Sequence, residues 1–102
     1  MIEVTAKDCF LIVKGHAKTA PKGYDLVCAA TSILCLTLAE NVRQQTEAVQ
    51  KPPKIRVKPG DCEIRVNPKA EYAESIRLLF RSTETGFYLL ARLFPDIVKV
   101  KN

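Results

Sequence analysis

Histidine is scarce in this sequence, and no two cysteines are separated by only two residues. Zinc sites in proteins use about four ligands, with the cysteines and histidines at short recurring spacings. The one histidine, His16, and four widely spaced cysteines do not make up such a set. We therefore expect the protein to bind no metal ion and to need no other cofactor.

A long uninterrupted apolar segment is also missing. The longest apolar run, DLVCAATSILCLTLAENV, has 14 residues between Asp25 and Glu40, whereas a bilayer-spanning helix needs about 20. The first residues, MIEVTAKD, are polar from the third position and do not resemble a secretory signal. These absences predict a soluble cytoplasmic protein with no membrane partner.

The cysteines are predicted to be free thiols, because without a secretory signal the protein would not meet an oxidising compartment. Cys28 and Cys35 lie seven residues apart in one apparent helix. That spacing separates them by about 10 Å along the helix axis, which is too far for a disulfide.

The chain carries a net charge of +5, from 16 Lys and Arg against 11 Asp and Glu. Basic domains of this size often bind nucleic acid. Here the basic residues are scattered, mainly over QKPPKIRVKPG and VKVKN, and no aromatic residues alternate with them. We interpret them as a solvated basic surface, with contact to RNA as the alternative and no nucleic acid required for function.

The pattern of apolar residues predicts a two-layer α+β fold. Residues 2–5 alternate and residues 9–14 are β-branched and aromatic, which predicts a first hairpin. Residues 54–58 and 61–67 alternate about the turn signal PGD and predict a second. Helices are expected from Asp25 to about Gln45 and from Asn67, followed by Pro68, to Pro95, with a last short strand in DIVKVK. The order is strand, strand, helix, strand, strand, helix, strand.

Both helices are predicted to be amphipathic and to cover one mainly antiparallel sheet. The first helix would bury Leu26, Ala30, Ile33, Leu34, Leu38 and Val42. The second would bury Tyr72, Ile76, Leu79, Phe80, Thr83, Phe87, Leu90 and Phe94. With 102 residues and 47% hydrophobic content, residues 1–102 are expected to form a single domain around one core.

The stretch GHAKTAPKGYDLVCAATS, residues 15–32, is the candidate functional site. His16 follows a predicted strand, and Cys28 lies close to the start of the next helix. If Asp25 is the N-cap, Cys28 is the third helical residue, where free backbone N–H groups and the helix dipole favour a thiolate. A nearby histidine would then serve as its general base. Alternatively, Cys28 is a small core residue and His16 an ordinary surface residue.

This stretch resembles the signature of the ribosomal-processing cysteine protease family, Prp, which reads G-H-A, a loop, then G-x-D-[IL]-V-C-A-[AG]-x-S. The matching positions are Gly15, His16, Ala17, Gly23, Asp25, Leu26, Val27, Cys28, Ala29, Ala30 and Ser32. The order of elements and the ending FPDIVKVKN are also similar to the family, so the resemblance covers nearly the whole chain.

The resemblance implies a bacterial or phage cysteine endopeptidase that removes a short N-terminal extension from a large-subunit ribosomal protein. It places the nucleophile at Cys28 and the general base at His16, and it implies a homodimer. Asp25 would shape the site, by orienting His16 or by capping the helix only. The loop KTAPK departs from the glycine-rich or acidic loop of many members, so a phage capsid or scaffold protein is an alternative substrate.

Four further residues are assigned supporting roles. The backbone N–H groups of Cys28 and Ala29 are candidate oxyanion donors, and Ser32 belongs to the same motif. Gly15 and Gly23 are candidate hinges of a substrate loop between His16 and the helix. Two non-catalytic alternatives remain, namely a ribosome- or RNA-binding module with a basic surface and a dimeric scaffold.

Overall fold

The computed structural model describes residues 1–16 and 22–101, and of residues 22–25 the backbone alone. The elements are β1 (Ile2–Lys7), β2 (Phe10–Gly15), α1 (Lys22–Arg43), β3 (Lys54–Lys58), β4 (Asp61–Arg65), α2 (Ala73–Leu93) and β5 (Val98–Lys101). A short 3-10 helix, Ala70–Tyr72, precedes α2. The predicted order of strands and helices is confirmed.

The five strands form one sheet in the order β3-β4-β2-β1-β5. Neighbouring strands are antiparallel except β1 and β5, which run parallel because α2 carries the chain back across the sheet. Both predicted hairpins are present. Their turns contain Asp8 and Gly60, which have positive φ angles of 53° and 74°.

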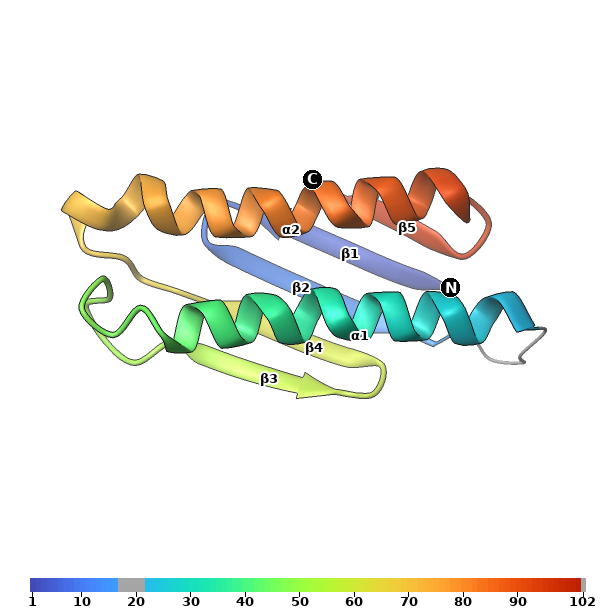
Figure 1. Ribbon diagram of the computed structural model, residues 1–102, viewed down its shortest axis with the longest axis horizontal. Helices are drawn as coiled ribbons and strands as arrows, with labels where there is room; N and C mark the ends of the chain where they lie inside the picture. Colours follow the sequence, from blue (N-terminus) through green and yellow to red (C-terminus); the bar gives the residue numbers. More distant parts are fainter. Residues whose placement is uncertain (17–21, 102) are drawn as a thin grey trace.

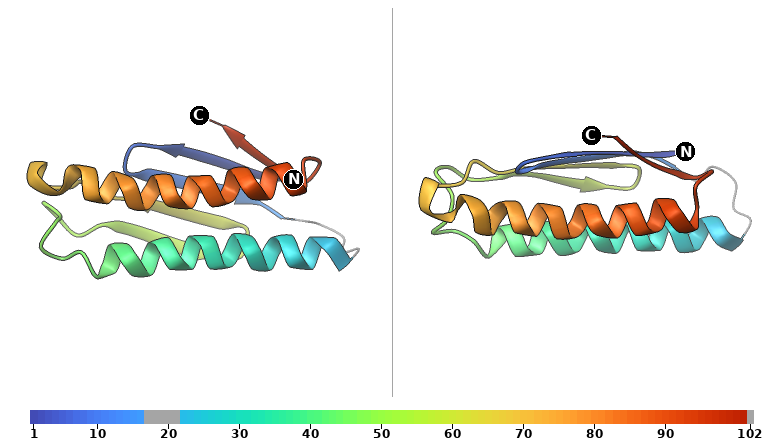
Figure 2. Two further views of the ribbon diagram at one scale, coloured as in Figure 1. Left: turned by 45° about the horizontal axis from the view of Figure 1, so that its top comes forward. Right: turned by 90° about the horizontal axis from the view of Figure 1, so that it is seen from above.

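The two helices lie side by side on one face of the sheet, and no described element covers the other face (Figure 1 and Figure 2). Alternate strand residues point toward the helices, so Val4, Leu11 and Ile64 are almost fully buried. Their sequence neighbours point to the uncovered face. The α+β class and the two-layer arrangement are therefore confirmed.

Helix α2 buries most of the predicted apolar stripe, but Tyr72, which was expected in it, lies in the preceding 3-10 helix and is 36% exposed. The buried residues of α2 are Ile76, Phe80, Thr83, Phe87 and Leu90. The predicted start at Asn67 is wrong, since Pro68 pairs in an isolated bridge with Val49 and the α-helix begins at Ala73. The predicted end before Pro95 is confirmed.

Helix α1 differs from the prediction at its start. It begins at Lys22, so Asp25 is its fourth residue and cannot be its N-cap, and Gly23 lies within the helix instead of the preceding loop. Aspartate is a good capping residue, which is why the helix was predicted to begin at Asp25. The helix instead extends beyond Asp25 toward the N-terminus. Cys28 is consequently the seventh residue of the helix.

The buried face of α1 also differs from the predicted one. Leu26 and Ile33 were expected in the core but are 67% and 61% exposed, whereas the helix buries Val27, Cys35, Leu38, Ala39 and Val42. Because α1 is apolar around most of its circumference, the spacing of its apolar residues is compatible with two different buried faces. Contact with the sheet determines which of the two is buried. Leu26, Ile33 and Leu36 remain as an exposed apolar stripe, called here the outer α1 stripe.

Within the described residues, α1 is also long and apolar enough to cross a membrane. The window Leu26–Arg43 has a mean hydropathy of 1.4, and 28% of it is buried inside the protein. This finding rests on length and composition, which a helix packed on a sheet can satisfy equally well.

Candidate active site

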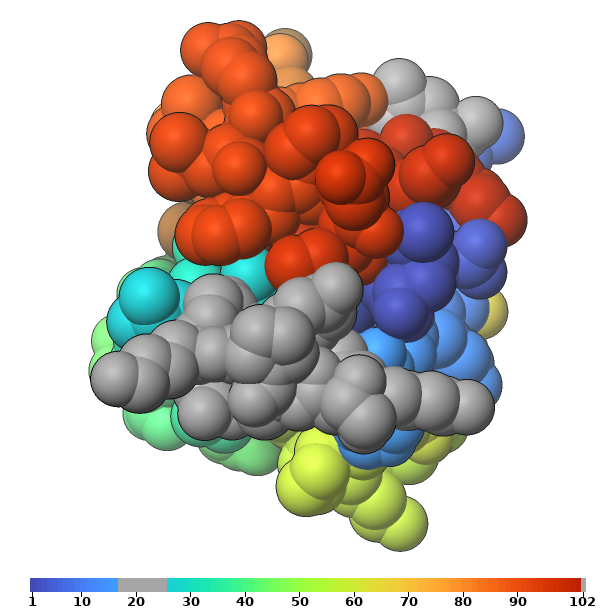
Figure 3. Space-filling view, turned by 90° about the vertical axis from the view of Figure 1, so that its right-hand side faces the viewer, coloured from blue at the N-terminus to red at the C-terminus, as the bar shows by residue number. Residues whose placement is uncertain are grey.

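A cavity of about 120 Å³ opens at the end of the sheet where β2 ends, beside α1 and the turn between β3 and β4. Both His16 and Cys28 line it. The histidine arrives from the end of β2 and the cysteine from α1, so two residues twelve positions apart in sequence border one space. Figure 3 views this end of the molecule.

The turn between β3 and β4 fixes one side of His16. The Gly15 N–H donates a hydrogen bond of 3.1 Å to the Gly60 carbonyl oxygen, and the Met1 amino group donates one of 3.0 Å to the His16 carbonyl oxygen. A Cβ on Gly60 would lie 2.1 Å from Cε1 and Nε2 of the His16 ring. The His16 imidazole therefore occupies the space that a side chain at position 60 would fill.

Gly60 is a site residue that the sequence analysis missed. The PGD signal was interpreted as a hairpin turn, which is correct, but the contact with His16 depends on how β4 pairs with β2. No hydrogen-bond partner of the His16 imidazole is found among the described residues. The Asp25 side chain is not described, so its proposed role in orienting His16 stays a prediction.

Cys28 is half-buried, whereas Cys9, Cys35 and Cys62 are buried. Its position in α1 corrects one argument from sequence. The orphan N–H groups and the favourable dipole of a helix are confined to its first turn, and Cys28 and Ala29 lie beyond that turn. Their backbone N–H groups are therefore not free oxyanion donors, and the exposed Ala29 side chain is not among the described cavity residues.

Two hydroxyl side chains line the same cavity, from Thr31 and Ser32. Ser32 follows Cys28 by four residues and so lies on the same side of the helix. Thr31 was not singled out from the sequence. Its Oγ1 is buried and has no hydrogen-bond partner among the described residues.

Two more sulfur atoms lie in the cavity wall, those of Cys35 and Cys62. A side-chain hydrogen bond with Cys62, together with burial, raises the pKa of the Cys35 thiol well above its usual range. Burial also raises the pKa of Cys9. The hydrogen bond with Cys35 lowers the pKa of the Cys62 thiol. Because Cys9, Cys35 and Cys62 are all buried, Cys28 is the most accessible of the four thiols.

Two sequence predictions fall partly outside the described residues. The proposed substrate loop spans residues 17–24, of which residues 17–21 are not described and the rest belong to α1. Gly15 has a φ of 119°, and a Cβ there would lie 2.0 Å from the Met1 carbonyl oxygen. Gly15 thus makes a close backbone contact, and its role as a hinge stays a prediction.

Among the described residues, no group of three His, Cys, Asp or Glu side chains is placed to bind a metal ion. The model of the family described as cysteine protease Prp matches residues 1–99. The chain belongs to this family. It is therefore a cysteine protease, and family membership argues against both non-catalytic alternatives.

Solved structures show the same fold. The Prp ribosomal processing protease of S. aureus, in complex with a substrate peptide, has a TM-score of 0.72 and 16% identity, covering 98% of this chain and 95% of that one. The same protease with a covalently linked product peptide has a TM-score of 0.72 and 17% identity, with the same coverage. The protein SMU.848 of Streptococcus mutans has a TM-score of 0.72 and 24% identity, covering 99% and 92%. No curated protein matches the chain.

Proposed function

We propose that this Prp-family protease cleaves peptide bonds with Cys28 as the nucleophile and His16 as the general acid and base. The observation that carries the proposal is that both side chains line one cavity. The Cys28 thiol is also the least buried of the four. The other two cysteines of the cavity are held in a buried pair.

The proposed reaction has two acyl-transfer steps. The Cys28 sulfur attacks the scissile carbonyl carbon, while His16 accepts the thiol proton. His16 then donates this proton to the leaving amine as the C–N bond breaks, and a thioester to Cys28 remains. In the second step His16 removes a proton from water, the resulting hydroxide displaces Cys28, and the thiol is restored.

The carbonyl oxygen gains negative charge in both steps and needs hydrogen-bond donors. Because the N–H groups of Cys28 and Ala29 lie beyond the first helical turn, we assign this role to side chains instead. The Thr31 and Ser32 hydroxyls line the cavity, and Thr31 Oγ1 has no partner among the described residues.

As substrate we propose the N-terminal extension of a large-subunit ribosomal protein precursor, or a phage capsid or scaffold protein. Two observations support a peptide substrate of this class. The sequence motif resembles that of the family, and the S. aureus protease with the same fold is a ribosomal processing protease bound to a peptide. A ribosomal substrate would place the protein in the cytoplasm.

We propose further that the protein acts as a homodimer, as the family resemblance implies. The outer α1 stripe supports this, since Leu26, Ile33 and Leu36 are 67%, 61% and 48% exposed along one helix. A second copy of the same stripe would cover these side chains. Large exposed apolar patches of this kind commonly mark protein interfaces.

Cleavage of a precursor ribosomal protein, followed by intact-mass analysis, tests the function. We expect the wild-type chain to remove a short N-terminal segment. Cys28→Ala should abolish cleavage, and His16→Ala should slow it by about 10² to 10⁴. Cys9→Ala is the matched control, because Cys9 lies in the turn between β1 and β2 and outside the cavity. Cleavage by Cys28→Ala would contradict the proposal.

A further inference from the structure

The uncovered face of the sheet carries the net charge of the protein. Strand pairing and the alternation of strand residues place eight basic side chains on this face: Lys7, Lys14, Lys54, Arg56, Lys58, Arg65, Lys99 and Lys101. Its acidic residues are Glu3, Asp61 and Glu63. We call this surface the basic sheet face.

Eight positive and three negative residues give the basic sheet face a formal net charge of +5, which equals that of the whole chain. The other eight basic residues are matched by the other eight acidic ones. The charge that looks scattered in sequence is therefore gathered on one side of the molecule. A five-stranded face is about 19 Å wide, at about 4.8 Å between strands.

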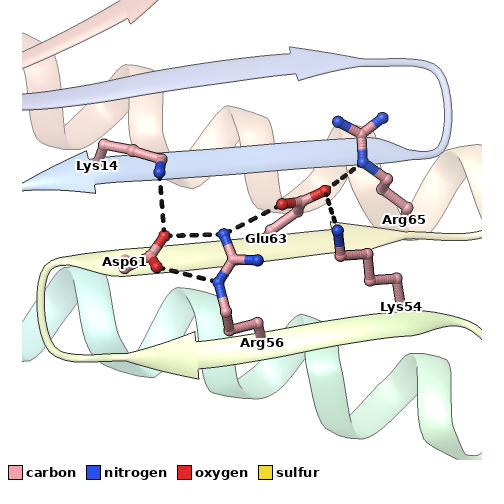
Figure 4. Close-up of polar contacts among 6 residues, drawn as sticks. All are labelled: Lys14, Lys54, Arg56, Asp61, Glu63 and Arg65. Carbon is pink, nitrogen blue, oxygen red and sulfur yellow. Dashed lines mark hydrogen bonds and ion pairs between the residues drawn. The ribbon is translucent and has the colours of Figure 1, made fainter.

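The acidic residues on this face are shared among several cations (Figure 4). Glu63 contacts Arg65, lies 3.3 Å from the Lys54 Nζ and lies 3.1 Å from an Arg56 nitrogen. Asp61 lies 3.0 Å from Arg56 and 3.5 Å from the Lys14 Nζ. Two carboxylates thus hold four cations, which orders these side chains and leaves positive charge uncompensated.

The face also offers a surface for stacking. The Arg65 guanidinium lies 4.2 Å from the centre of the Phe10 ring, and Phe10 is only partly buried on β2. Aromatic rings and arginine planes on open sheets stack the bases of single-stranded RNA, while basic side chains contact its phosphates. DNA duplexes are read mainly by a helix or a two-stranded ribbon in the major groove, which a broad flat sheet cannot enter.

We propose that the basic sheet face binds single-stranded RNA through its phosphate backbone, with at least one base stacked near Phe10. The surface reaches the active site, because Lys58 and Asp61 belong to this face and also line the cavity. Bound RNA would therefore hold the enzyme with its cavity next to whatever protein that RNA carries. This activity is separate from peptide cleavage and does not depend on the proposed dyad.

The test is fluorescence anisotropy of a labelled 20-nucleotide single-stranded RNA with the full chain, measured from about 50 to 300 mM KCl. Each phosphate contact contributes about −0.7 to the slope of log K against log salt, so about four contacts give a slope near −3. Lys14→Gln with Lys99→Gln should weaken binding by about tenfold at 100 mM KCl and make the slope shallower by about 1 to 1.5. Phe10→Leu should weaken it by at least about fivefold.

Lys51→Gln with Lys69→Gln is the matched control. It removes the same charge from two exposed residues outside the sheet and should change the affinity by less than about twofold. Three results would overturn the proposal: no RNA binding at 50 mM KCl, an equal loss of affinity in the control, or equally strong competition by polyglutamate or anionic vesicles. The last result would assign the face to an acidic polypeptide or a membrane surface.

Discussion

Replacing Gly60 by alanine tests the geometry of the candidate active site most directly. A Cβ at this position would lie 2.1 Å from two atoms of the His16 ring, well below the 3.0 Å that real Cβ contacts respect. The turn backbone is held by strand pairing and by the hydrogen bond between Gly15 and Gly60. The imidazole, as the free end of a side chain, has to move instead.

Two effects of different size follow from this substitution. Alanine at a φ of 74° costs about 1 to 2 kcal/mol, which for a domain of this size lowers the melting temperature by roughly 4 to 16 °C. Displacement of His16 removes the proposed general base, and such a group contributes about 10² to 10⁴ in rate. Gly60→Ala should therefore leave a folded protein at 20 °C with nearly the activity of His16→Ala.

The assay is single-turnover cleavage of a precursor peptide by Gly60→Ala, His16→Ala and the double variant. Without the His16 ring the new Cβ has nothing to displace, so the double variant should cleave within about threefold of His16→Ala alone. Gly86→Ala is the control. Its Cβ would lie 2.6 Å from Leu34 of the neighbouring helix, and neither residue is among those that line the cavity, so cleavage should be retained.

The result that would refute this reasoning is a Gly60→Ala variant with a lowered melting temperature and wild-type cleavage. The position of the His16 ring against Gly60 would then be irrelevant to the reaction. If the loss of cleavage rate in the double variant equalled the product of the losses in the two single variants, Gly60 would act independently of His16.

Further predictions concern thiol reactivity, the substrate, the dimer and acid stability. Iodoacetamide at pH 6 should label Cys28 first, since the other three cysteines are buried, and peptide mapping showing another site first would contradict this. Thr31→Val should lower single-turnover cleavage by about 10-fold or more with little change in melting temperature, if its unpaired hydroxyl serves the substrate. Ile33→Lys should convert the proposed dimer to a monomer in light scattering, because Ile33 is 61% exposed on the outer α1 stripe. The hydrogen bond to Arg65, together with Lys54, lowers the pKa of Glu63 from 4.5 to about 2. The ionised carboxylate therefore stabilises the folded protein fully above pH 4.5, and this stabilisation is lost as the pH falls toward 2. Glu63→Gln should flatten the fall in melting temperature over that range.

The sequence by itself determined the order and type of the elements. Alternation with a period of two marked the hairpins, and the PGD turn marked the reversal between β3 and β4. Spacings of three and four residues marked α2, and every buried residue of that helix belongs to the predicted stripe. These signals are local, because each depends only on how a few consecutive residues share one face.

Helix α1 shows where local signals fail. Its apolar residues surround most of the helix, so periodicity could not choose between the stripe that contains Val27 and Cys35 and the one that contains Leu26 and Ile33. Contact with the sheet made the choice. The start of α1 was also misplaced, because a capping residue can equally stand inside a first turn, as Asp25 does.

The candidate site was found by its motif, but its construction depends on tertiary structure. The sequence suggested that His16 and Cys28 are neighbours, since a helix that folds back on its strand brings the two ends together. Only the pairing of β4 with β2 placed Gly60 against the His16 ring. The thiolate argument from a helix N-terminus was wrong because it required the helix to begin at Asp25.

The distribution of charge was decided by the tertiary structure alone. In sequence the lysines and arginines are spread over distant segments, and each strand carries only one to three charges on one side. The register of five strands aligns these sides, and the two helices cover the opposite face. A basic surface results from long-range pairing, which no local pattern specifies.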